Sequence, residues 1–264
     1  MQRGAVCYGI PSSRRGAAFS QKSDLMSRRK RDRHDYFLNV DTIARRLSER
    51  YGDDTHGNKD NPLRELLFII CSVQTNEMLY RSTYTRLTTT FRNFRQLTYA
   101  TEEEIAAVIA RGGLARQKAH TIKGILSRLV FDFGIPTLRR LRELSDAECE
   151  EYLESLPGVG RKSARCVMMY SLGREVFPVD SNCWRICRRL GWVRPTRPDK
   201  SCSPNDMNRI QKRVPPELRF SLHVNFVSHG RDHCLPLQPK CDSCCIREYC
   251  RTGRRAELAA AKAE

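Results

Sequence analysis

The sequence has no long apolar run and relatively few acidic residues. No stretch approaches the roughly 18 consecutive apolar residues of a membrane-spanning helix, and no signal-peptide core follows the N-terminus. Asp and Glu total 30 against 47 Lys and Arg, so the 264-residue chain carries a net charge of +17. A surplus of this size is typical of proteins that bind nucleic acid or an anionic membrane surface. We expect a soluble, intracellular protein with no membrane segment.

The positive charge is spread over the whole chain. Residues 1–34 hold nine basic and two acidic residues, so they contribute +7 and the remaining chain contributes +10. We interpret these residues as a disordered basic tail, because they show no periodicity. A targeting peptide, a nuclear signal, a DNA-binding arm, a plain solvated tail and a true start at Met26 all stay open as interpretations. Residues 253–264 are expected to form a C-terminal tail.

Sustained alternation of apolar and polar residues, the mark of half-buried strands, is also missing, and helix signals take its place. Thr101 with Glu104, and Ser145 with Glu148, have the spacing of a capping box ahead of an apolar run. Pro62 stands where the first turn of a helix tolerates a missing N–H. The sequence therefore predicts an all-α fold.

The segment Leu156 to Lys162 separates two of the predicted helices and contains Gly158 and Gly160. Two glycines two residues apart permit a tight turn and a close approach of the backbone to an outside group. The helix that follows points its N-terminal amides beyond the turn, where a DNA phosphate fits. An ordinary helix–helix turn with a glycine cap explains the same residues, so both interpretations stay open here.

Lys162 lies in the first turn of that second helix, where the positive end of the helix dipole disfavours a cation. Arg161 and Arg165 add like charge nearby, so we expect a lowered pKa for Lys162. A neutral amine is a nucleophile that forms Schiff bases, whereas a charged lysine would contact phosphate instead. Asp180 precedes another predicted helix, where its carboxylate either caps the helix or stabilises developing positive charge.

The chain has twelve cysteines, and five of them crowd into residues 234–250. The scattered ones are interpreted as buried thiols. Four of the crowded ones have the spacing C-x6-C-x2-C-x5-C, which suits tetrahedral zinc or a four-iron cluster, with zinc favoured by its general abundance. Cys245 leaves the third ligand ambiguous. The candidate metal ligands are Cys234, Cys241, Cys244 and Cys250.

Taken together, the hairpin LPGVGRKSA, the segment FPVDSN and the cysteine spacing resemble the endonuclease III branch of the helix-hairpin-helix DNA glycosylases, over roughly residues 35–252. The resemblance implies a bifunctional DNA glycosylase and AP lyase of base excision repair that removes oxidised pyrimidines. It also implies that Lys162 is the nucleophile, that Asp180 is the catalytic aspartate and that the cysteines hold a [4Fe-4S] cluster. The implied partner is double-stranded DNA with a damaged base, bound by a monomer in a DNA-associated location.

The resemblance further implies two lobes with a DNA groove between them. A six-helix lobe spans 55–174, and the cluster lobe combines 35–54 with 175–252. Gln74 in CSVQTN matches the residue that fills the gap left by the flipped base, and Leu114 in GGLARQKA matches the wedge in the opposite strand. By themselves they read as a helix-end polar residue and a core leucine. Further candidate DNA contacts are Gly158, Gly160 and Arg161.

The sequence departs from the family pattern after the aspartate, because Asn182 stands where histidine is usual. FPVDSNCWRICRRLGWV is also similar to plant methylcytosine glycosylases and some mismatch-thymine relatives. The alternatives are therefore a glycosylase for mismatched thymine or modified cytosine and, in another class, a non-catalytic DNA-binding module. The adenine-mismatch branch is disfavoured, because it has a glutamate where Ile69 stands and lacks the lysine.

Overall fold

The structure, a computed structural model, describes residues 39–193 and 201–260. Every regular element in these two ranges is a helix, which confirms the all-α prediction. The predicted tail of residues 1–34 lies outside the described residues, as do residues 261–264. Of the C-terminal segment, residues 253–260 belong to the last helix. None of the described helices is long and apolar enough to cross a membrane.

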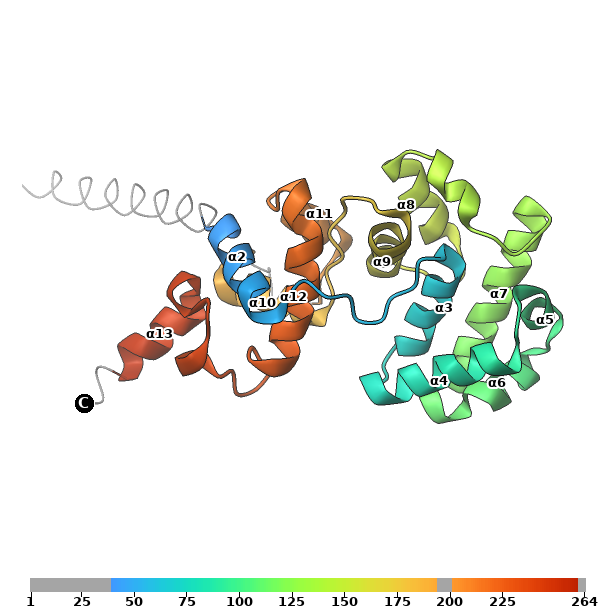
Figure 1. Ribbon diagram of the computed structural model, residues 1–264, viewed down its shortest axis with the longest axis horizontal. Helices are drawn as coiled ribbons and strands as arrows, with labels where there is room; N and C mark the ends of the chain where they lie inside the picture. Colours follow the sequence, from blue (N-terminus) through green and yellow to red (C-terminus); the bar gives the residue numbers. More distant parts are fainter. Residues whose placement is uncertain (1–38, 194–200, 261–264) are drawn as a thin grey trace, which may run out of the picture.

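A larger helical group packs around one apolar core (Figure 1). The apolar faces of its helices form one core, in which Leu66, Ile105 and Ile122 have no exposed surface. The elements are α3 (Pro62–Ser72), α4 (Glu77–Thr90), α5 (Phe94–Tyr99), α6 (Glu102–Ile109), η1 (Ala110–Gly112), α7 (Ala115–Phe133), η2 (Arg139–Glu143), α8 (Asp146–Ser155) and α9 (Arg161–Leu172).

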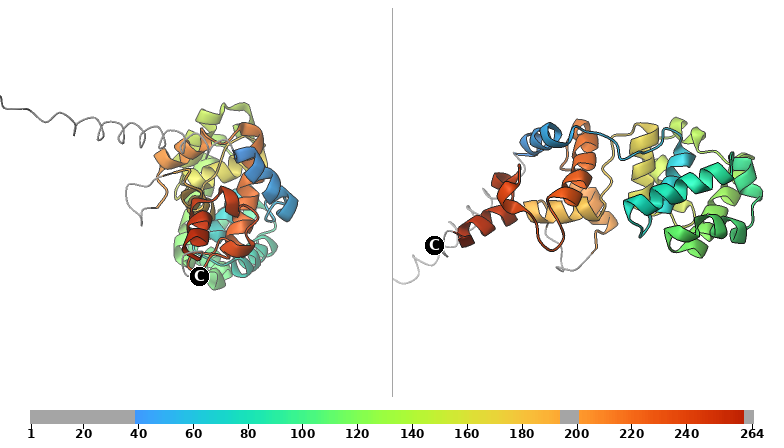
Figure 2. Two further views of the ribbon diagram at one scale, coloured as in Figure 1. Left: turned by 90° about the vertical axis from the view of Figure 1, so that its left-hand side faces the viewer. Right: turned by 60° about the horizontal axis from the view of Figure 1, so that its bottom comes forward.

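A smaller helical group combines a segment near the beginning of the described chain with its last part (Figures 1 and 2). Leu47 packs there with Phe177 and Phe226, all three fully buried. The elements are α2 (Val40–Tyr51), α10 (Ser181–Leu190), α11 (Pro204–Gln211), η3 (Pro216–Leu218), α12 (Arg219–Asp232), η4 (Cys241–Ser243), η5 (Arg247–Tyr249) and α13 (Arg251–Ala260).

The predicted helix starts agree with the structure. Both capping boxes form, with the Thr101 and Ser145 hydroxyls accepting from backbone N–H groups and the two glutamates closing the box. Pro62 opens α3 behind the Asn61 cap, and α9 begins at Arg161. These local signals are confirmed because they depend only on residues within one helical turn. Cys71, Cys149, Cys166, Cys183 and Cys187 are buried free thiols, as expected for the scattered cysteines, whereas Cys202 is only half-buried and Cys7 lies outside the described residues.

Candidate active site

A cavity of about 710 Å³ lies where the two helical groups meet. The larger group contributes Gln74 and Lys162 to its walls, and the smaller group contributes Asp180, Asn182 and His223. Lys162 comes from the first turn of α9, whereas Asp180 immediately precedes α10. The structure thus brings the predicted lysine and aspartate to one cavity, although they belong to different cores.

The hairpin before α9 owes its shape to its glycines. Gly158 has a φ of 70°, in the left-handed region, and an added Cβ would lie 2.9 Å from Thr121 Cγ2. Gly160 is the N-cap of α9, is exposed, and has no side-chain cap, and no atom lies within 4 Å of an added Cβ. The amides at the start of α9 therefore lack a capping side chain, which is the arrangement that accommodates a phosphate.

The predicted lowering of the Lys162 pKa is wrong, because the pKa of Lys162 is raised. Cys166 exerts the largest raising influence, followed by Asp180 and Glu65, and together they outweigh burial. Burial raises the pKa of Cys166 to about 11, so Cys166 is a neutral thiol at neutral pH. Asp180 and Glu65 are the carboxylates that act in the same direction on the pKa of Lys162.

The two arginines fail to lower that pKa because their charges are already paired within the hairpin. Arg161 contacts Glu150 at 2.6 Å and Glu154 at 2.9 Å, and the buried Arg165 contacts Glu150 at 3.1 Å. The positions of the two arginines beside Lys162 in the sequence do not reveal the carboxylates that α8 contributes. A contact between Arg161 and DNA stays a prediction, and this side chain does not line the cavity.

Asp180 is held as a charged N-cap. Its Oδ1 accepts from the Cys183 amide at 2.7 Å, and its Oδ2 accepts from Asn182 Nδ2 at 3.0 Å. Burial alone would raise the pKa of Asp180, but His223, the Cys183 amide, Lys162 and Asn182 outweigh it and lower the pKa. The capping role and a charge-stabilising role are therefore compatible at this position.

Asn182 serves the aspartate directly, although the sequence singled it out only as a departure from the family pattern. Its Nδ2 donates to Asp180, and its Oδ1 accepts from Arg185 at 2.8 Å. Gly230 makes room for it, since a Cβ there would lie 2.6 Å from the Asn182 Cβ. The amide is thus oriented from both ends and favours the ionised carboxylate.

Two buried titratable residues at the site were missed by the sequence reasoning. Glu65 has no exposed surface and accepts from the Lys59 amide at 2.7 Å and from Asn58. His223 lines the cavity, its Nδ1 lies 2.9 Å from the Pro178 carbonyl oxygen, and burial lowers its pKa to about 4. The lone carboxylate in the apolar run ELLFII was a usable signal for Glu65.

Gln74 and Leu114 lie on the connections that precede α4 and α7. Both are exposed, and both have a positive φ, of 49° and 51° respectively. Gln74 lines the cavity with Lys162, whereas Leu114 lies outside it and is the N-cap of α7. Leu114 is 44% exposed, so the reading of it as a core leucine is wrong.

The four candidate cysteine ligands surround one small cavity between α10, α12 and the C-terminal loops, whereas Cys245 does not line it. Arg189 donates to Cys234 Sγ at 3.1 Å, and His229 Nε2 lies 3.6 Å from Cys244 Sγ. In the described ranges no group of three or more His, Cys, Asp or Glu side chains is gathered as ligands of one metal ion. Four thiols facing one space, one beside an Arg189 N–H and one beside a His229 ring nitrogen, fit a bound iron–sulfur cluster.

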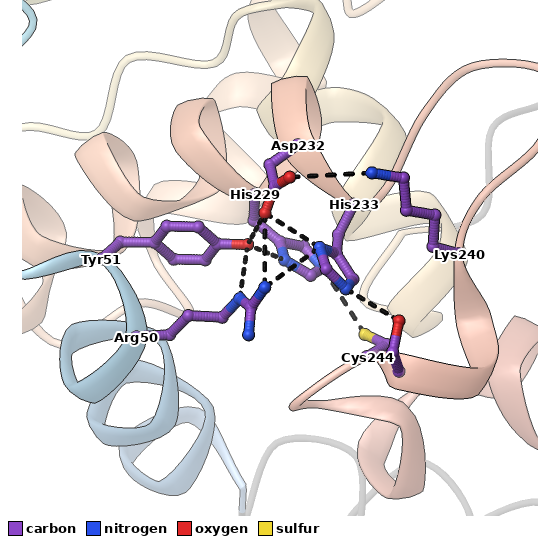
Figure 3. A network of polar contacts seen from close by, with 8 residues as sticks. Arg50, Tyr51, His229, Asp232, His233, Lys240 and Cys244 are labelled. Atoms are coloured by element: carbon purple, nitrogen blue, oxygen red, sulfur yellow. Dashed lines mark hydrogen bonds and ion pairs between the residues drawn. The ribbon is translucent and has the colours of Figure 1, made fainter.

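A polar network holds the cysteine loop against α2 and α12 (Figure 3). Tyr51 OH lies 3.0 Å from His229 Nδ1, which fixes the ring whose other nitrogen faces Cys244. His233 bridges Asp232 at 2.9 Å and Ser243 at 3.1 Å. The loop carrying the cysteines is therefore oriented by side chains from outside it, as ligand loops usually are.

Comparisons with known proteins define the class. Residues 67–213 match the family described as HhH-GPD superfamily base excision DNA repair protein, and the chain belongs to this superfamily. It is 28% identical over 216 residues to endonuclease III of Thermotoga maritima, covering 82% of this chain and 94% of that protein. The resemblance to the endonuclease III branch is thereby confirmed.

Further relatives include the DNA glycosylase/AP lyase ROS1 of Arabidopsis thaliana, 33% identical over 181 residues, which are 63% of this chain and 13% of that protein. The chain spans only 58% of the length of another Arabidopsis thaliana relative and 12% of the length of a third, DEMETER-like protein 2. A solved non-covalent endonuclease III–DNA complex has a TM-score of 0.69 at 26% identity, covering 84% of this chain and 98% of that one.

Proposed function

We propose that this chain is a bifunctional DNA glycosylase and AP lyase of base excision repair that acts on oxidised pyrimidines. The observation that carries the proposal is the convergence of Lys162 and Asp180 on one cavity from two separate helical groups. A plain phosphate-binding lysine does not require a charged aspartate held beside it. Double-stranded DNA with a damaged base is the proposed partner, and a monomer is the proposed working form.

The proposed reaction starts after the damaged nucleotide has left the duplex and entered the cavity. The Lys162 ammonium gives up a proton that balances the negative charge on the departing base, and the resulting amine bonds to C1′ as the base leaves with the electron pair. Ionised Asp180 stabilises the positive charge that develops on the sugar. Ring opening yields a Schiff base, and loss of a C2′ proton with departure of the 3′ phosphate nicks the strand.

Cys234, Cys241, Cys244 and Cys250 are proposed to hold a [4Fe-4S] cluster. When bound, the cluster would cross-link the loop between α12 and α13, because all four ligands are protein thiolates. This chain also places an Arg189 N–H and a His229 ring nitrogen beside two of the sulfurs. We assign the cluster a structural and DNA-positioning role.

A second candidate function is excision of mismatched thymine or modified cytosine. It is favoured by the similarity to ROS1 and to DEMETER-like protein 2 of Arabidopsis thaliana, and by Asn182 at a position where histidine is usual. A non-catalytic DNA-binding module stays as the alternative from another class. The presence of both Lys162 and Asp180 argues against it.

A panel of three duplexes separates these functions, carrying thymine glycol, a T:G mismatch or 5-methylcytosine. We expect base release and strand nicking on the thymine glycol duplex at a rate well above the other two. Preferred release from the T:G or methylcytosine duplex would support the second function instead. No release from any duplex by protein with its iron–sulfur absorbance intact would support the non-catalytic module.

A further inference from the structure

Two connections near the cavity share an uncommon backbone feature. Among the described residues, only Asp53, Gln74 and Leu114 are non-glycine residues with positive φ. Left-handed backbone in residues with a Cβ is strained, and it persists only where the surrounding structure holds it. Gln74 and Leu114 are 40 positions apart in the sequence, so whatever holds the two connections has to join distant segments.

Lys118, in the first turn of α7, joins the two connections by hydrogen bonds. Its ammonium donates to the Cys71 carbonyl oxygen at 2.9 Å, to Thr75 Oγ1 at 2.7 Å and to the Gly112 carbonyl oxygen at 2.9 Å. Two of these acceptors flank Gln74, and the third lies two residues before Leu114. All three ammonium hydrogens are therefore donated in hydrogen bonds within the protein, and the residue is only 3% exposed.

Thr75 adds a second link between the same connections. Its hydroxyl donates to the Gly112 carbonyl oxygen at 2.7 Å. Gly112 itself is seated against Thr83, because a Cβ there would lie 2.6 Å from Thr83 Oγ1. The connection that carries Leu114 is thus joined at Gly112 to α4 and to the connection that carries Gln74.

We propose that Lys118 is a positioning residue for DNA distortion, which clamps the Gln74 and Leu114 connections so that both side chains enter the duplex as one rigid unit. This inference rests on the proposed function. An ammonium suits the role because one buried side chain reaches three acceptors in two segments remote in the sequence, which no neutral residue of similar length provides. Because the Gln74 and Leu114 connections are held in place before binding, less conformational entropy is lost when they bind DNA.

The clamp acts on extrusion of the nucleotide rather than on the chemistry at C1′. A single-stranded oligonucleotide with an abasic site exposes C1′ without any opening of a duplex. Loss of the clamp should therefore slow the reaction on duplex DNA and leave cleavage of the single-stranded abasic site unchanged. A residue that merely supports the fold would affect both substrates alike.

Lys118→Met tests the clamp, and Lys123→Met is the matched control. Lys123 lies on the same helix and also donates to two backbone carbonyl oxygens, those of Thr98 and Ala100, which belong to another connection. We expect Lys118→Met to lower the single-turnover rate on a thymine glycol duplex by about tenfold or more, with a change of less than about twofold on the single-stranded abasic site. Lys123→Met should alter neither rate.

A 2-aminopurine next to the base that faces the lesion reports unstacking, and its fluorescence rise should be slowed by Lys118→Met and not by Lys123→Met. Thr75→Val, which removes the second link, should give the same pattern and replaces Lys118→Met if that variant does not fold. Equal rates for Lys118→Met and wild type on the duplex, or equal losses on both substrates, would overturn the clamp. A wild-type protein inactive on both substrates would instead overturn the proposed function.

Discussion

At the scale of single residues, the protonation of Lys162 and Asp180 depends on partners that are remote in the sequence. Cys166, Asp180 and Glu65 raise the pKa of Lys162, whereas the neighbouring arginines are paired with glutamates of α8. Asp180 stays ionised through donors in its own turn. Because the pKa of Lys162 is raised, proton loss from Lys162 becomes part of the proposed reaction.

Asn182→Ala should shift the acid limb of the pH–rate profile. The pKa of Asp180 is lowered in the folded protein, so its carboxylate stays charged, and active, down to a pH below the usual carboxylate range. Loss of the Asn182 donor raises that pKa, so activity should fall at a higher pH, by about half to one pH unit. Single-turnover rates between about pH 3 and 7 measure the shift. An unchanged acid limb would show that Asn182 does not support the charge of Asp180.

The sequence was sufficient to single out Lys162 and Asp180, because a hairpin motif and a helix cap are local patterns. It was not sufficient for their protonation states, since Glu65, His223 and Asn182, which influence them, belong to three different elements. A pKa depends on charges within a few ångströms in space, and distance along the chain does not measure that.

At the scale of elements, the hairpin between α8 and α9 contains two glycines with different structural requirements. Gly158→Ala places a Cβ in left-handed backbone against Thr121, whereas Gly160→Ala meets nothing. We expect Gly158→Ala to lower the free energy of unfolding by about 1–3 kcal/mol and Gly160→Ala to leave it nearly unchanged. Denaturant unfolding measures both. Equal destabilisation by the two variants would contradict the account of the turn.

The cysteine loop offers a matched pair of adjacent residues. Cys244 lines the cavity with the other three candidate ligands, whereas Cys245 does not. Cys244→Ser should therefore reduce the iron content and the visible absorbance of the purified protein, and Cys245→Ser should preserve both. Loss of iron from Cys245→Ser with retention in Cys244→Ser would reverse the ligand assignment. Stoichiometric zinc without iron in the wild-type protein would refute the cluster itself.

Helix starts were predictable from the sequence wherever a cap was present, as at Thr101 and Ser145. The partnership of α2 with α12 was not accessible from local patterns, because it joins the two ends of the described chain. Only the resemblance to known glycosylases supplied it, as part of the predicted lobe that combines 35–54 with 175–252. The exact bounds of both lobes stay a prediction.

At the scale of the whole molecule, two separately packed helical groups meet at the cavity, and an ion pair extends across the junction. Arg231 of α12 contacts Glu77 of α4 at 2.6 Å, with both side chains 39% exposed. At that exposure the pair contributes little stability. DNA bound across the junction would contact both groups at once.

The net charge of +17 predicts DNA binding that weakens with salt. Each phosphate contacted releases counterions, so the logarithm of the association constant should fall linearly with the logarithm of salt concentration. With about six contacts, affinity should fall roughly a thousandfold between about 50 and 200 mM salt. Fluorescence anisotropy with a labelled duplex measures the slope. Affinity independent of salt would contradict a backbone-contacting mode of binding.

The proposed mechanism requires the amine of Lys162 to bond covalently to the sugar of the extruded nucleotide. Borohydride reduction during reaction with a thymine glycol duplex tests it, because reduction converts a Schiff base into a permanent protein–DNA bond. We predict a trapped adduct for the wild-type protein and none for Lys162→Ala, with the two proteins showing the same unfolding curve. An absent wild-type adduct, or an equally strong adduct from Lys162→Ala, would contradict it.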